Sequence, residues 1–192
     1  LLIVLSATVV PAGADSLALR GTVTPDDFAT AVERHGLNLR VAMAVDNLFV
    51  IGYTLALLGI VALVRSRIPL LGNVALGGVL LGALLDYTEN SITLGLIQSH
   101  MLGTAPKPGW LVILHIVGQI KYLVAFLAVA VLGVGLWSSK PLDRVVSILT
   151  WLFPIVGVAS FVFPTTSPLL ALWMLILLVS GGLLLWRRAS EL

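Results

Sequence analysis

The sequence predicts an all-α membrane protein, a polytopic bundle of about six transmembrane helices with one short external amphipathic helix. Only 10% of its 192 residues are charged and 59% are hydrophobic, whereas an ordinary soluble domain is about 25% charged. The apolar residues also form runs long enough to cross the roughly 30 Å hydrocarbon core of a bilayer. We therefore expect one transmembrane domain, residues 1–192, in which residues 12–38 form an external loop with the amphipathic helix.

The first apolar run ends at Val10 and is followed by Pro11. We interpret it as the outer end of a membrane helix that begins before the numbered sequence. The alternative is the tail of a cleaved signal peptide, with Ala12-Gly13-Ala14 as a small-residue cleavage site.

The external segment contains a helix start at Thr24-Pro25-Asp26-Asp27. Threonine is a good N-cap, proline suits the first helical position, and the acids favour the positive end of the helix dipole. Phe28, Ala31 and Val32 then form an apolar stripe, and Gly36 is a plausible end. We expect a short helix that lies on the membrane surface or caps the bundle.

Five longer apolar segments follow, and each has the length needed to span a bilayer. Pro154 predicts a kink in the fourth of these, and the glycine pairs within them favour close helix packing. Tryptophans lie near several segment ends, as in an aromatic belt. The segments run approximately over Leu39–Val64, Pro69–Gln98, Gly109–Trp137, Leu142–Phe163 and Ser167–Trp186.

The basic residues predict the orientation. Short loops and the C-terminal tail on one side carry Arg or Lys, and cytoplasmic loops of this kind are enriched in these residues. We therefore expect a multi-pass protein of the bacterial inner membrane with a cytoplasmic C-terminus. The net charge of +2 arises from such segment ends, so nucleic acid is an unexpected partner. The basic residues in question are Arg65, Arg67, Lys140, Arg144, Arg187 and Arg188.

Polar and ionisable residues inside three consecutive spans are the candidate site. A charge at the centre of a bilayer costs about 3 kcal/mol on insertion scales, so such residues usually face a partner, water or a ligand. Helical spacing places Asp86, Glu89 and Asn90 on one face of their span, and it groups His115 with Gln119 while turning Lys121 aside. The candidate ligand-binding or proton-binding residues are Asp46, Asn47, Asp86, Glu89, Asn90, His115, Gln119 and Lys121.

The charges of this group do not balance. Three carboxyls face one lysine and one histidine, and a dry site cannot keep excess negative charge uncompensated. A carboxyl is then protonated, His115 is charged, or a cation is bound. If a metal binds, its ligands would be Asp46, Asp86, Glu89 and His115, a carboxylate-rich set that suits hard or borderline divalent ions. The absence of cysteine excludes disulfides and thiolate metal sites.

The segment Leu85-Asp86-Tyr87-Thr88-Glu89-Asn90-Ser91 resembles a D-x-x-E-N helix of small bacterial polytopic membrane proteins of unknown function. In those proteins the preceding helix carries an aspartate near its outer end, and the following helix carries a lysine before an aromatic residue. Asp46 and Lys121-Tyr122 match both places. The resemblance implies a fold and a set of polar residues but brings no activity with it.

These observations leave three functional interpretations open. We favour a buried acidic and lysine-containing pocket, in the outer half of the bundle, that binds a small or lipid-like ligand or a proton. The alternatives are a structural or scaffold subunit of a membrane complex, and a membrane enzyme that uses the carboxylates with a metal or as acid and base. The expected partners are the lipid bilayer, a small-molecule or lipid ligand, and another membrane protein.

Overall fold

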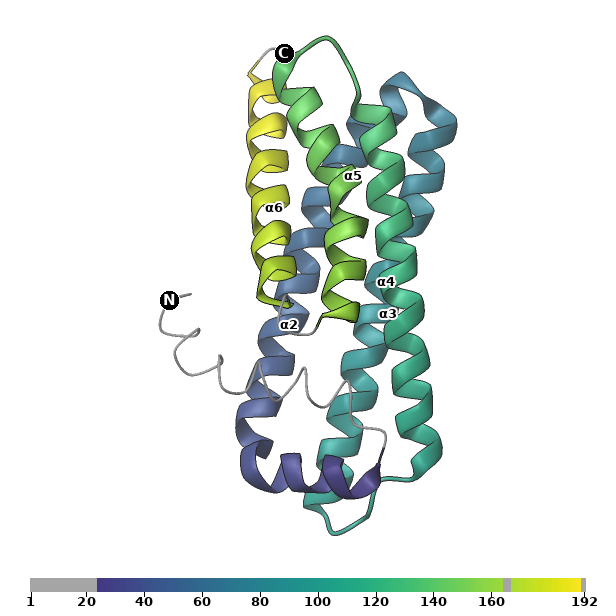
Figure 1. The fold of residues 1–192 in the computed structure, drawn as a ribbon, viewed down its shortest axis with the longest axis vertical. Helices are drawn as coiled ribbons and strands as arrows, with labels where there is room; N and C mark the ends of the chain where they lie inside the picture. Colours follow the sequence, from purple (N-terminus) through teal and green to yellow (C-terminus); the bar gives the residue numbers. More distant parts are fainter. Residues whose placement is uncertain (1–23, 164–166, 191–192) are drawn as a thin grey trace. The chain divides into compact units, whose positions relative to one another are not determined.

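The computed structural model describes residues 24–163 and 167–190, and all regular structure in that part of the chain is α-helical. The five helices are long and apolar enough to cross a membrane, which confirms that the five longer segments are helices of spanning length. The predicted first span, residues 1–10, lies outside the described residues, so the count of six stays a prediction. In Figure 1 the helices are α2 (Pro25–Arg67), α3 (Pro69–Met101), α4 (Pro108–Leu136), α5 (Pro141–Val162) and α6 (Ser167–Ala189).

Proline marks the beginning of every described helix. It occupies the first position of α2, α3, α4 and α5 and the second position of α6. Proline suits this place because its missing N–H would have had no partner inside the helix, and its φ is already helical. By contrast, Pro154 lies within α5 and does not end it.

Helix α2 begins as predicted but does not end where predicted. The Thr24 hydroxyl accepts a hydrogen bond from the Asp27 amide at 3.3 Å and donates to the Asp27 carboxylate at 2.5 Å, so it caps the helix. The helix then continues through Gly36 to Arg67. A separate external helix is therefore not confirmed. No proline follows Gly36, and the next residues are compatible with a helix, so nothing in the local sequence stops it.

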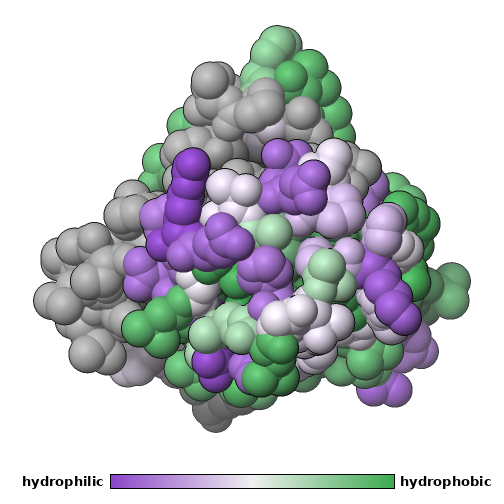
Figure 2. Space-filling model, turned by 90° about the horizontal axis from the view of Figure 1, so that it is seen from below, coloured by the Kyte–Doolittle hydropathy of each residue, from purple (hydrophilic) through white to green (hydrophobic). Residues whose placement is uncertain are grey.

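The chain forms two compact units, which are described separately. The first contains residues 24–51 and 84–121, from the beginning of α2, the end of α3 and the beginning of α4. The amphipathic stripe at the start of α2 is buried here, because Phe28 and Val32 pack with residues of α3 and α4. Hydrophilic residues gather on the end of this unit where α2 begins (Figure 2). The apolar core consists of Phe28, Val32, Leu39, Leu96, Ile97, Leu111 and Leu114.

Helix α3 ends in a Schellman motif, the hydrogen-bonded turn that commonly closes a helix. The Thr104 amide donates to the Ser99 carbonyl, the Gly103 amide donates to the His100 carbonyl, and both distances are 2.9 Å. Gly103 has a φ of 82°, a conformation that glycine adopts without the steric penalty of a Cβ. This turn leads to α4.

The second unit contains residues 52–83 and those from 122 onward, and all five helices contribute to it. Its core includes Ile60, Val64, Leu132 and Leu184. Glycine allows close approach of the helices, since a Cβ on Gly135 would lie 2.2 Å from a methyl of Val64. The close helix packing that was predicted at glycine residues is thus observed at Gly135.

Candidate functional site

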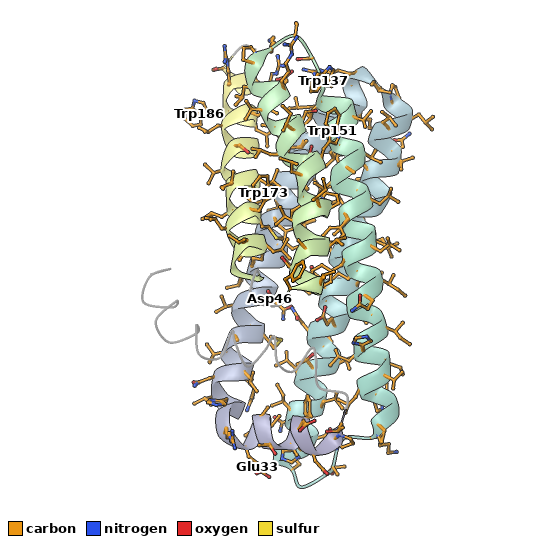
Figure 3. The ribbon with its side chains drawn as sticks, in the orientation of Figure 1. Glu33, Asp46, Trp137, Trp151, Trp173 and Trp186 are labelled. Atoms are coloured by element: carbon orange, nitrogen blue, oxygen red, sulfur yellow. The ribbon has the colours of Figure 1, made fainter. Side chains whose placement is uncertain are left out.

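Three helices of the first unit contribute six polar side chains, which form two contact groups joined at the adjacent residues Glu89 and Asn90 of α3. Helix α2 contributes Asp46 and Asn47, α3 contributes Asp86, Glu89 and Asn90, and α4 contributes Lys121. These six residues are named the polar cluster below. Asp46 is labelled in Figure 3, on the part of α2 that belongs to this unit. The juxtaposition follows from helical spacing, because residues three and four apart on α3 share one face.

Lys121 makes two ion pairs. Its Nζ lies 2.7 Å from Oδ1 of Asp86 and also pairs with Oε2 of Glu89. The side chains of Lys121 and Glu89 are only 7% and 5% exposed. Removing one partner of a buried pair leaves an uncompensated charge, which is far costlier than losing a surface pair. These contacts therefore fix α4 against α3.

The Asn90 amide connects α3 to α2. Its Nδ2 donates to Oδ2 of Asp46 at 2.8 Å and to Oδ1 of Asn47 at 3.0 Å. Because both partners accept through oxygen, these bonds also determine which end of the amide is nitrogen. The other end, Oδ1, is buried and has no hydrogen-bond partner among the described residues. Asn90 is 1% exposed, so the polar cluster contains a buried acceptor that lacks a donor.

Burial is graded across the polar cluster. Glu89, Asn90 and Lys121 are buried, whereas Asp46 and Asn47 are partly exposed. The α2 side is thus the more open side. On α4, Gly118 faces Glu89, and a Cβ at that position would lie 3.8 Å from the Glu89 carboxyl carbon. The lack of a side chain at Gly118 therefore leaves room beside the carboxylate.

Two of the eight candidate residues lie apart from this group. His115 and Gln119 are exposed, while Leu111, Leu114 and Lys121 form the buried face of α4. The predicted grouping of His115 with Gln119, away from Lys121, agrees with the structure, but their shared face is the exposed one and does not meet the site. The signal for the buried face of α4 is a 3-4-3 spacing of residues along the helix. The residues are Leu111, Leu114, Gly118 and Lys121. The histidine therefore does not contribute charge to the polar cluster.

The geometry gives no support to a metal centre. Within residues 24–163 and 167–190, no group of three or more His, Asp or Glu side chains converges as metal ligands. His115, the one nitrogen ligand in the predicted set, is exposed on α4. The set of Asp46, Asp86, Glu89 and His115 thus stays a prediction from the sequence.

The second unit contains a buried carboxylate that sequence reasoning missed. Asp143 is 1% exposed and accepts hydrogen bonds from Arg67 at 3.0 Å, from Arg188 at 2.6 Å and 2.9 Å, and from the Ser138 hydroxyl at 2.6 Å. It is the one acid among six basic residues in the described part of this unit, which is the signal that could have found it. The carboxylate joins the ends of α2 and α6 to the beginning of α5.

Five apolar helices and a polar cluster within three of them are the features of a multi-pass membrane protein. Comparison of the chain with protein-family models, with curated proteins and with solved structures finds no match. The functional argument therefore depends on the residues themselves.

Proposed function

We propose that the polar cluster is a cation-binding site of a multi-pass membrane protein, and that it takes up a proton or a small cationic ligand. One observation supports this above the others: the polar cluster contains three carboxylates and one lysine, and the lysine pairs with two of them. With all four groups ionised, the polar cluster carries two excess negative charges. Glu89 is buried, and Asp46 and Asp86 are only partly exposed, so this excess charge favours protonation or a bound cation.

The unpartnered oxygen of Asn90 supports the same proposal. A buried acceptor without a donor costs about 1 to 3 kcal/mol. Asn90 Oδ1 belongs to the amide that already contacts Asp46 and Asn47. A protonated amine or a hydrated proton supplies both a donor for this oxygen and a positive charge for Asp46. The partly exposed α2 side is the route by which such a ligand would enter.

The ion pairs of Lys121 favour a second candidate, a purely structural role. Lys121 already neutralises one carboxylate and joins α3 to α4. In that case the polar cluster would lock helix packing within a scaffold subunit. The two candidates make different predictions for Asp46. This carboxylate accepts a hydrogen bond from Asn90 and forms no ion pair with a lysine or arginine among the described residues.

Infrared difference spectroscopy between pH 5 and pH 9 tests the proton-binding form. We expect a protonated carboxyl band in the full-length protein that is lost when the three acids of the polar cluster are replaced by Asn or Gln, because these three carboxyls face one lysine. Asp26→Asn is the matched control, since Asp26 is an exposed acid of the same helix, and it should leave the band unchanged.

A thermal-unfolding series tests the small-cation form. Methylammonium and sodium should raise the melting temperature of the full-length protein at constant ionic strength, but not that of Asp46→Asn. If no carboxyl band appears and neither cation changes the melting temperature of the wild type, the cation-binding proposal is wrong. An equal rise in melting temperature in the wild type and in Asp46→Asn would show that the cation binds outside the polar cluster.

The charge distribution supports the proposed orientation, with the C-terminus in the cytoplasm of a bacterial inner membrane. The described part of the second unit carries six basic residues and one acid, whereas the first carries six acids and four lysines or arginines. Cytoplasmic segments are enriched in Lys and Arg. In that orientation the polar cluster would lie in the outer half of the bundle.

A further inference from the structure

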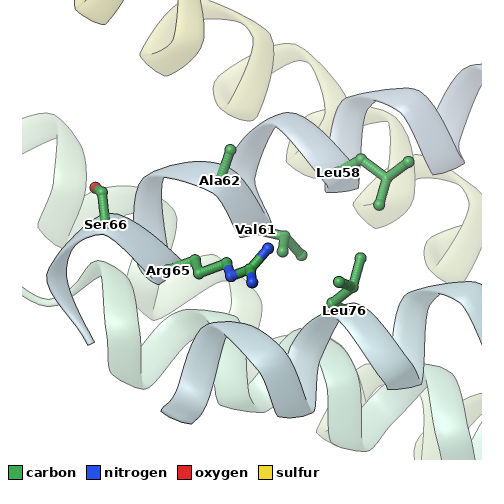
Figure 4. Close-up of a pocket in the computed structure, with 6 residues that line it drawn as sticks. All are labelled: Leu58, Val61, Ala62, Arg65, Ser66 and Leu76. Atoms are coloured by element: carbon green, nitrogen blue, oxygen red, sulfur yellow. The ribbon is translucent and has the colours of Figure 1, made fainter. Parts of the chain in front are cut away.

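A groove in the second unit lies apart from the polar cluster. Its volume is about 400 Å³, and it is lined by residues of α2 and α3. Four of its six lining residues are apolar, and Arg65 and Ser66 lie at its end nearest the turn between the two helices. Figure 4 shows the six lining residues, which are Leu58, Val61, Ala62, Arg65, Ser66 and Leu76.

The groove follows one face of α2. Leu58, Ala62 and Arg65 are related by four and seven residues, so they share that face, and they cover about 10 Å of helix at 1.5 Å per residue. Gly72 of α3 makes the neighbouring crossing possible, because a Cβ there would lie 2.4 Å from the Arg65 Cα. The result is an apolar groove between α2 and α3 with the Arg65 side chain at one end.

The guanidinium of Arg65 is directed along this groove. In Figure 4 it points toward Val61 and Leu76. Arg67 and Arg188 share the Asp143 carboxylate, and the Arg144 side chain donates to the Ser138 carbonyl at 2.8 Å. No ion pair or hydrogen bond joins the Arg65 side chain to another described residue. Its charge is therefore available to an anion outside the described protein.

We propose that this groove binds one anionic phospholipid, with an acyl chain along Leu58, Val61 and Leu76 and the headgroup phosphate against Arg65. Charge complementarity selects this occupant. The described part of the second unit carries six positive charges and one negative charge, and arginine binds phosphate through paired N–H donors. An apolar groove with a single cation at its end matches a molecule that has one long apolar part and one anionic headgroup.

Native mass spectrometry of the full-length protein in a neutral detergent tests the proposal. The probes are phosphatidylglycerol and phosphatidylcholine with identical acyl chains, and the readout is the affinity of the first bound lipid. One basic residue near a lipid surface favours an anionic lipid about fivefold. We therefore expect at least this preference in the wild type and its loss in Arg65→Gln, with phosphatidylcholine binding unchanged.

Three further variants separate this site from general surface charge. Arg65→Lys should keep part of the preference. Ala62→Phe should weaken both lipids, because it fills the groove from an exposed helix position. Arg187→Gln removes the same charge from a residue outside the groove and should keep the full preference. The proposal fails if Arg65→Gln retains the preference, if Arg187→Gln loses it equally, or if millimolar inorganic phosphate displaces the lipid.

Discussion

Replacing Lys121 with methionine tests how strongly the first unit depends on the one buried cation among its described residues. The change keeps the length of the side chain but removes the partner of Asp86 and Glu89, so the polar cluster goes from two to three excess negative charges. Breaking a buried ion pair by removing one partner typically destabilises a protein by about 3 to 5 kcal/mol. Lys121 is 7% exposed and pairs with two carboxylates, so we expect a loss in this range at pH 7.

Unfolding by sodium dodecyl sulfate in mixed micelles measures this loss. The double variant Lys121→Met, Glu89→Gln should recover part of the stability, since it removes a carboxylate together with the cation. Lys107→Met, an exposed lysine of the same unit, should change stability by less than about 0.5 kcal/mol. A similarly small effect for Lys121→Met would refute the reasoning and show that the lysine is hydrated.

Three other predictions concern topology and the second unit. A cysteine at Ser139 should resist a membrane-impermeant thiol reagent in intact cells while one at Thr104 reacts; the reverse pattern would invert the proposed orientation. Asp143→Asn should lower the free energy of unfolding by about 3 kcal/mol, because it leaves Arg188 and the partly exposed Arg67 without the buried carboxylate that they share, and an unchanged denaturation midpoint would contradict this. Gly135→Ala should cost about 1 to 3 kcal/mol by overpacking, whereas Gly182→Ala, with no neighbour within 4 Å of the added Cβ, should be neutral in the same assay.

Much of the helical architecture could be predicted from the sequence, because long apolar runs bounded by proline have few alternatives. The segments expected to begin at Pro69 and Ser167 begin at those residues. The ends of helices were harder to predict. Gly36 is a weak signal for termination, and the burial of Phe28 and Val32 against α3 and α4 favours one continuous α2. That packing is a tertiary effect that local sequence does not contain.

Most residues of the site could be predicted from the sequence, but the rotation of α4 about its own axis could not. The spacing of Glu89 and Asn90 on α3 predicted their shared face, since it depends on one helix alone. The rotation of α4 depends on what packs against it. Leu111 and Leu114 settle it by joining the apolar core, and this turns Lys121 inward and His115 outward. Helical spacing within α4 separates Lys121 from His115, but it does not tell which of the two faces packs inward.

Helix α3 carries adjacent residues, Glu89 and Asn90, that bind different neighbours. One pairs with α4 through Lys121, and the other bonds to α2 through Asp46. Sliding α3 by one helical turn, about 5.4 Å, would break both sets of contacts at once. The three helices of this unit therefore share a single register. A substitution that shifts α3 along its axis would therefore disturb its contacts with both flanking helices at once.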